Sequence, residues 1–250
     1  MKQKNPFHLS KSLRFLPTLI IIIISSQCLA QKLEKMPVDL ETDFALSSMP
    51  PHVRGGATVY LLDPDKGYYI GRQGTNGFIC FVLRTDWEFG EFRTDVATPI
   101  SYDAEGAKTI WPSYADVEEM RASGKYSGPQ IKDIMTDRFK NGYYKVPSRP
   151  GISYMIAPIM RSYDGSSPHV ITMSIPHYMF YAPYAREADI GGNSHDGGPL
   201  VLGEGKPEAY IIIPAGVTEK ARILEENKDL LKRLTDYRAY FKVEPKGSHH

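Results

Sequence analysis

Cysteine is nearly absent from this chain: Cys28 and Cys80 are the two present in 250 residues. Cys28 lies in a segment that we expect to be removed, which leaves Cys80 as the remaining thiol. A single thiol excludes an internal disulfide framework, which commonly stabilises small exported domains. Cys80 stands within the apolar run 78–83, which is typical of a buried strand. We expect it to pack in the core, with an intermolecular disulfide or a nucleophile as the alternatives.

Excess basic charge is also missing. The chain has 30 Lys and Arg residues against 29 Asp and Glu residues. Four of the basic residues and none of the acidic ones lie in the first 30 positions, so the rest has 26 against 29 and a net charge of −3. Nucleic-acid binding and polybasic membrane binding both depend on a concentrated positive surface. We therefore expect neither kind of partner.

Long apolar runs are missing after the N-terminus, and the run at residues 15–24 is itself short. A bilayer core needs about 20 apolar residues. The run follows a basic stretch and precedes a small, polar one, in which Cys28 and Ala30 stand where a signal peptidase requires small side chains. The pattern predicts a signal peptide over residues 1–30, export to the periplasm or the medium, and no transmembrane span after cleavage. The alternatives are an uncleaved anchor and a lipoprotein, which would need a small residue where Gln27 stands.

About 220 residues remain, enough for one sizeable core. Alternating or β-branched segments bounded by Gly- and Asp-rich turns predict strands, and apolar residues at helical spacing predict helices. We expect helices over 39–48, 113–121 and 129–139, and strands over 57–62, 68–72, 78–84, 152–158, 169–174, 177–181, 200–202 and 209–213. The first three strands read as an antiparallel meander, and 86–106 as irregular.

The fold class that follows is α+β, a single domain with a mixed or antiparallel sheet, two middle helices and a long C-terminal amphipathic helix. The globular part covers residues 31–216, the helix 217–243 and a disordered tail 244–250. Apolar residues of the helix recur at intervals of four and three, which is a coiled-coil seam with one buried asparagine. The seam either docks on its own domain or forms a homodimer. Its members are Ile223, Asn227, Leu230, Leu234, Tyr237 and Phe241.

The densest polar cluster lies at residues 177–198. His177, Asp189, His195 and Asp196 share this glycine-rich region. Imidazole and carboxylate together can bind Zn²⁺ or position a water molecule for general base catalysis. We take His177, Asp189 and His195 as candidate metal ligands, and His177 and Asp196 as candidate catalytic residues. Because no HExxH, HxH or CxxC spacing is present, an ordinary loop with a hydrogen-bonded strand histidine is the alternative.

Aromatic residues gather in the same region. Tyr178, Tyr181 and Tyr184 belong to one block, and exposed rings there would suit stacking on a sugar or an aromatic ligand. Alternation along a strand would bury about half of the block in the core. The three tyrosines are therefore candidate ligand-binding residues, with core packing as the alternative.

Four segments stand out by their motifs: residues 74–80 (GTNGFIC), 102–106 (YDAEG), 150–155 (PGISYM) and 177–184 (HYMFYAPY). They resemble a family of uncharacterised exported bacterial proteins. The resemblance implies bacterial origin and export, and it implies no activity. It also implies a second cysteine just before the YDAEG segment, able to pair with the first. Ser101 stands at that position here, so such a disulfide is lost.

Two functions follow as expectations. The first is an exported protein of the bacterial envelope that binds a small ligand or a protein partner through residues 177–198. The second is a metal-dependent hydrolase, with Zn²⁺ as the expected ion, that uses the His/Asp cluster at 177–196. The sequence leaves open whether the protein is an enzyme.

Overall fold

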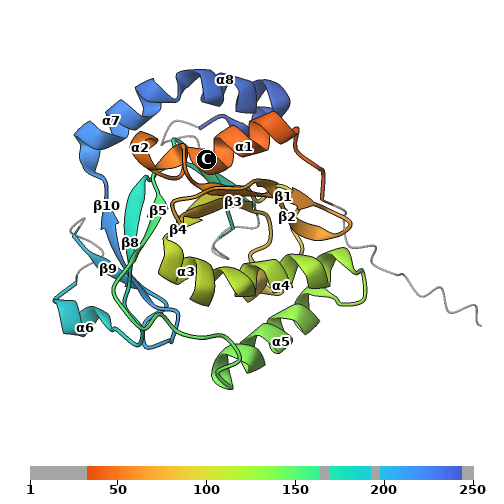
Figure 1. Cartoon of the computed structure of the whole chain (residues 1–250), viewed down its shortest axis with the longest axis vertical. Helices are drawn as coiled ribbons and strands as arrows, with labels where there is room; N and C mark the ends of the chain where they lie inside the picture. Colours follow the sequence, from red (N-terminus) through yellow and green to blue (C-terminus); the bar gives the residue numbers. More distant parts are fainter. Residues whose placement is uncertain (1–32, 164–168, 193–197, 244–250) are drawn as a thin grey trace, which may run out of the picture.

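The computed structural model describes residues 33–163, 169–192 and 198–243. A β-sheet lies between two helical layers, which confirms the predicted α+β class (Figure 1). None of the helices in these ranges is long and apolar enough to cross a membrane. One layer contains α1 (Val38–Leu46), α2 (Pro51–Arg54), α7 (Gly216–Glu226) and α8 (Lys228–Tyr237), and the other α3 (Ala104–Thr109), α4 (Trp111–Ala122) and α5 (Gly128–Lys140).

The described residues form one sheet of eight strands in the order β2-β1-β3-β4-β5-β8-β10-β9. Neighbouring strands are antiparallel except β1 and β3, which are parallel. The strands are β1 (Thr58–Asp63), β2 (Gly67–Arg72), β3 (Ile79–Leu83), β4 (Thr98–Tyr102), β5 (Ile152–Met155), β8 (His177–Tyr181), β9 (Leu200–Leu202) and β10 (Tyr210–Pro214). A separate pair contains β6 (Met160–Ser162) and β7 (Ile171–Met173).

The predicted meander is wrong at its third strand. β1 and β2 form the expected hairpin, but the chain then crosses the start of β1, so that β3 lies on its far side. The crossing is close: a Cβ atom on Gly74 would lie 2.3 Å from backbone atoms of Gly56 and Ala57. Because only glycine fits at such an approach, the GTNG segment makes a crossover rather than a hairpin turn.

The prediction of an irregular segment over 86–106 is also wrong in part. It contains the short 3₁₀ helix η1 (Trp87–Phe89), the fully buried strand β4 and the start of α3. Pro99 hides the strand in the sequence, because proline is normally confined to sheet edges. Here Pro99 pairs with Val82 on one side and lies beyond the β4–β5 pairing, which involves Ser101 and Tyr102.

The predicted C-terminal helix is two helices, broken at Asn227, whose backbone leaves helical geometry (φ −111°, ψ 18°). The Asn227 side chain is buried and donates a hydrogen bond to the Ile223 carbonyl oxygen (2.8 Å). Farther along the seam, Leu234 packs in the core, and Phe241 of η3 (Ala239–Phe241) contacts Phe44 edge to face. The seam thus docks on the chain's own sheet layer. A homodimer through this helix stays a prediction.

Candidate functional site

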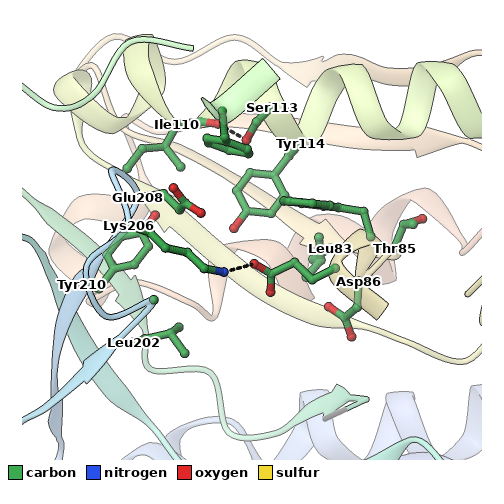
Figure 2. A pocket seen from close by; sticks show the side chains of 14 residues that line it. Leu83, Thr85, Asp86, Ile110, Ser113, Tyr114, Leu202, Lys206, Glu208 and Tyr210 are labelled. Carbon is green, nitrogen blue, oxygen red and sulfur yellow. Dashed lines mark hydrogen bonds and ion pairs between the residues drawn. The ribbon is translucent and has the colours of Figure 1, made fainter. Parts of the chain in front are cut away.

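A cavity of about 220 Å³ opens on the α3–α4 side of the sheet, where η1, α4 and the β9–β10 hairpin meet (Figure 2). Its wall combines aromatic rings, carboxylates and one lysine. The end of β3 and the residues after it belong to the lining. The lining residues are Leu83, Thr85, Asp86, Trp87, Glu88, Ile110, Ser113, Tyr114, Phe139, Leu202, Gly203, Lys206, Glu208 and Tyr210.

Two tyrosines bring hydroxyls to the cavity. Tyr114 comes from α4 and Tyr210 from β10, and both hydroxyls point toward the space that Glu208 faces (Figure 2). Behind them, the hydroxyl of Tyr102 interacts with both, at 3.3 Å from that of Tyr210. Burial raises the pKa of Tyr114 to about 12 and also raises that of Tyr210. The two phenols therefore stay protonated at neutral pH and act as hydrogen-bonding groups.

Asp86 lies at the other end of the cavity, directly before η1. Its Oδ2 atom accepts a hydrogen bond from the Tyr163 backbone N–H (3.2 Å). Burial nevertheless raises its pKa to about 6, because removal from water disfavours the charged form. This carboxyl changes charge near physiological pH.

Glu208 is the least satisfied polar group of the wall. Its Oε2 atom is buried and has no hydrogen-bond partner among the described residues. Burial raises the pKa of this carboxyl. A buried oxygen without a donor costs free energy unless a ligand or water supplies one. A hydrogen-bond donor of a ligand would therefore gain the most binding free energy at Glu208.

Lys206 and Glu88 both line the cavity and form an ion pair, with 3.6 Å between Nζ and Oε1. The dashed line that begins at Lys206 in Figure 2 marks this pair. Both side chains are 54% exposed. Exposed pairs of this kind contribute about 0–1 kcal/mol, so this one can open when a ligand enters.

His177, predicted as a metal ligand and as a catalytic residue, is the first residue of β8. It is buried, and its Nδ1 atom lies 2.7 Å from the Ile175 carbonyl oxygen. Burial lowers the pKa of the imidazole. The geometry is that of a strand histidine with a backbone partner, and His177 does not line the cavity.

Of the remaining members of the predicted metal site, the structure describes Asp189 alone. His195 and Asp196 lie outside the described residues. Asp189 is an exposed residue of α6 (Glu187–Ile190) and accepts a hydrogen bond from the Arg186 backbone N–H (2.8 Å). Within the described ranges, no group of three His, Cys, Asp or Glu side chains could hold a metal ion. The Zn²⁺ site and the hydrolase remain predictions.

The three candidate ligand-binding tyrosines do not converge. Tyr181 is buried on the α3–α4 side of the sheet, where its ring contacts Tyr210. Tyr178 is three residues away on the same strand and therefore faces the opposite side, where its ring contacts Tyr154. Tyr184 lies beyond the strand and is exposed, with an unusual positive φ of 66°. None of the three lines the cavity.

Three of the resemblance segments meet at one side chain, that of Asp103. Its Oδ1 atom accepts hydrogen bonds from the backbone N–H of Glu105 and Gly106 and from the Tyr181 hydroxyl (2.9 Å). Its Oδ2 atom accepts the Ile152 N–H (3.0 Å). Asp103 thus caps α3 while it joins β5 and β8. These hydrogen bonds account for Asp103 and Tyr181 as parts of the framework.

The glycines of the same segments leave room for Tyr181. A Cβ atom on Gly106 would lie 2.2 Å from its hydroxyl oxygen, and one on Gly151 would lie 2.5 Å from its ring. Larger residues at either position would displace the tyrosine. The motifs therefore encode close packing behind the cavity.

Sequence reasoning missed the residues that line the cavity. They come from three segments, 83–88, 110–114 and 202–210, with Phe139 from α5, and no spacing rule connects segments so far apart. One signal was available: three acidic residues, Asp86, Glu88 and Glu208, each lie within two residues of an aromatic one. Comparison with protein families, curated proteins and solved structures finds no match to this chain.

Proposed function

We propose that this chain is an exported protein that binds a small polar molecule in the cavity between η1, α4 and the β9–β10 hairpin. The observation that carries the proposal is the Oε2 atom of the half-buried Glu208, which is itself buried without a hydrogen-bond donor at the wall of this cavity. Tyr114 and Tyr210 add hydroxyls and ring surface beside it. Concave sites of mostly apolar lining with a few polar groups are the usual form of small-molecule sites.

The size of the cavity favours a small ligand over a protein partner. A volume of about 220 Å³ suits a molecule of a few to about ten heavy atoms, whereas protein interfaces extend over roughly 800 Å² on each partner. The site lies outside the predicted 177–198 region, although the hairpin that closes it follows that region directly. Binding of a small molecule therefore stays the proposed function. The proposed site is the cavity beside the β9–β10 hairpin, and no longer residues 177–198.

Export is part of the proposal, and the pattern of residues 1–30 supports it. The single cysteine that remains is buried, and burial raises its pKa to about 12. A thiol of this kind is inert toward oxidation, which suits an oxidising compartment. Detection of a mature N-terminus at Gln31 in the exported fraction would test the export step.

A ligand screen by thermal shift tests the binding proposal. The chain from residue 31 onward is heated with a panel of small neutral, cationic and anionic molecules. We expect at least one member to raise the melting temperature, because a ligand that binds the folded state stabilises it. The rise should shrink in Glu208→Gln and persist in Glu204→Gln, an exposed acid of the same hairpin. A panel without effect, or equal shifts in both variants, contradicts the proposal.

A further inference from the structure

The polar groups of the cavity are unequally divided between acceptors and donors. Asp86, Glu88 and Glu208 bring three carboxyl groups. An ionised carboxylate accepts hydrogen bonds and donates none. Lys206, the one cation among the described lining residues, already pairs with Glu88. With the carboxyls ionised, the lining carries a net charge of −2.

The neutral donors are largely engaged within the protein. The hydroxyls of Tyr114 and Tyr210 both interact with the buried hydroxyl of Tyr102. The Ser113 hydroxyl donates to the Ile110 carbonyl oxygen (2.7 Å). The Thr85 hydroxyl accepts a hydrogen bond from Arg121 and also interacts with buried Glu118. The lining of the cavity is therefore rich in hydrogen-bond acceptors, and a ligand that carries donors would complement it.

We propose that the cavity binds a small organic cation, one that carries an ammonium group toward Glu208 and, in a longer ligand, a second one toward Asp86. This inference rests on the proposed function and names the ligand class for the same site. A protonated primary amine supplies three donors and a positive charge, which matches the buried Glu208 oxygen without a partner. The aromatic lining favours the same ligand, because cations are attracted to the faces of tyrosine and tryptophan rings.

Two other ligand classes fit less well. An anion would meet three carboxyl groups and a single exposed lysine. A bare metal ion needs several ligands within about 2.5 Å of one point, and no three acidic side chains of the described chain are arranged in this way. Because the carboxyls are separated, they suit an elongated cation, such as a diamine whose two ends reach two of them.

The pH dependence of binding follows from the groups around each carboxyl. Asp86 is faced by Glu88 from η1, by Glu118 from α4 and by the Ser162 hydroxyl from β6. Glu208 is faced by Lys206 from its own hairpin and by Glu88. The charges that face Asp86 are both negative, so its ionisation leaves charge that a cation would compensate. At Glu208, Lys206 already compensates part of the charge. Affinity should therefore rise as pH increases through about 6, where Asp86 loses its proton.

Calorimetric titration with matched probes tests the inference. 1,4-Diaminobutane supplies both charge and N–H donors, tetramethylammonium supplies charge without donors, and 1,4-butanediol is the neutral match in length. We expect 1,4-diaminobutane to bind about tenfold or more tightly than the diol, and about tenfold more tightly at pH 7.5 than at pH 5. Glu208→Gln and Asp86→Asn should each weaken cation binding by about tenfold, since both keep the shape of the side chain.

Two controls separate the outcomes. Glu204→Gln should leave binding unchanged, and Lys206→Met should strengthen cation binding, because it removes a competing cation. If neutral molecules of the thermal-shift panel bind as tightly as the cations, the inference fails and the proposed function stands. If no probe and no panel member binds, both fail.

Discussion

Cys80 on β3 and Ser101 on β4 lie directly opposite each other in the sheet, and both side chains are fully buried. Residues opposite each other in antiparallel strands have Cα atoms about 4.5–5.5 Å apart, which overlaps the range of disulfides. The resemblance segments imply a second cysteine at this position. Independently of the resemblance, the register places a thiol at 101 directly opposite the thiol of Cys80.

Ser101→Cys should therefore form an internal disulfide with Cys80. Closing this short loop should raise the free energy of unfolding by about 3 kcal/mol under oxidising conditions. Thiol titration in denaturant, with and without reductant, measures the bond. Thr98→Cys is the matched control, because Thr98 lies on the same strand, on the other face and opposite Leu83. Two free thiols in the oxidised Ser101→Cys protein would show that the register is not as described.

Glu41 makes stability depend on pH. Its side chain is 1% exposed, accepts a hydrogen bond from the Leu62 N–H (2.9 Å), and has a pKa raised to about 7 by burial. Because the folded pKa lies above the unfolded value, this contribution to stability is complete below about pH 4.5 and is lost as pH rises through 7. The loss is on the order of 3 kcal/mol.

Glu41→Gln should remove this part of the pH dependence and be more stable than the parent at pH 8. Urea unfolding at pH 5 and pH 8 measures the difference between the two proteins. Glu225→Gln, a change at an exposed acid of α7, should leave the pH slope as it is. A Glu41→Gln protein with the parent's slope would rule out Glu41 as its source.

Tyr181 should contribute to stability through its hydroxyl. Tyr181→Phe removes the hydrogen bond to Asp103 and leaves a carboxylate with one donor fewer, at a cost of about 1–3 kcal/mol. Tyr184→Phe, at an exposed ring, should change stability by less than about 0.5 kcal/mol. Denaturant unfolding of both variants measures the contrast. Equal effects would remove the framework role of Asp103 and Tyr181.

Leu234 tests how the C-terminal seam is buried. Leu234→Ala should lower the free energy of unfolding by about 2–5 kcal/mol, because the side chain is fully buried in the chain's own core. Val217→Ala, at a residue that is 88% exposed, is the control. In the docked arrangement, the unfolding midpoint of the parent should not depend on protein concentration. A midpoint that rises with concentration would instead support the predicted homodimer.

Local signals in the sequence predict local structure well here. The 129–139 helix and its stop at Asn141 and Gly142 are confirmed by α5, which ends at Lys140. The strands at 177–181 and 200–202 are confirmed at the predicted bounds. In each case the periodicity and the neighbouring glycine or proline point the same way.

The failures come from contacts between distant segments. The segment around Gly74 has the composition of a turn. That this segment crosses β1 depends on tertiary packing, which the local sequence does not reveal. The segment 86–106 gives no clear strand pattern, and β4 exists because Pro99 lies beyond the short β4–β5 pairing. The continuous seam around Asn227 gave no sign of the break between α7 and α8. The cavity depends on such packing throughout, because Asp86 and Glu208 come together only in the folded chain.

Amide chemical shifts during titration with 1,4-diaminobutane test the central claim most directly. Binding in the cavity predicts shifts confined to residues 83–88, 110–114 and 202–210, with loss of these shifts in Glu208→Gln. Shifts centred on residues 177–181 and 187–192, or no shifts with any probe, would contradict the assignment of the cavity as the binding site.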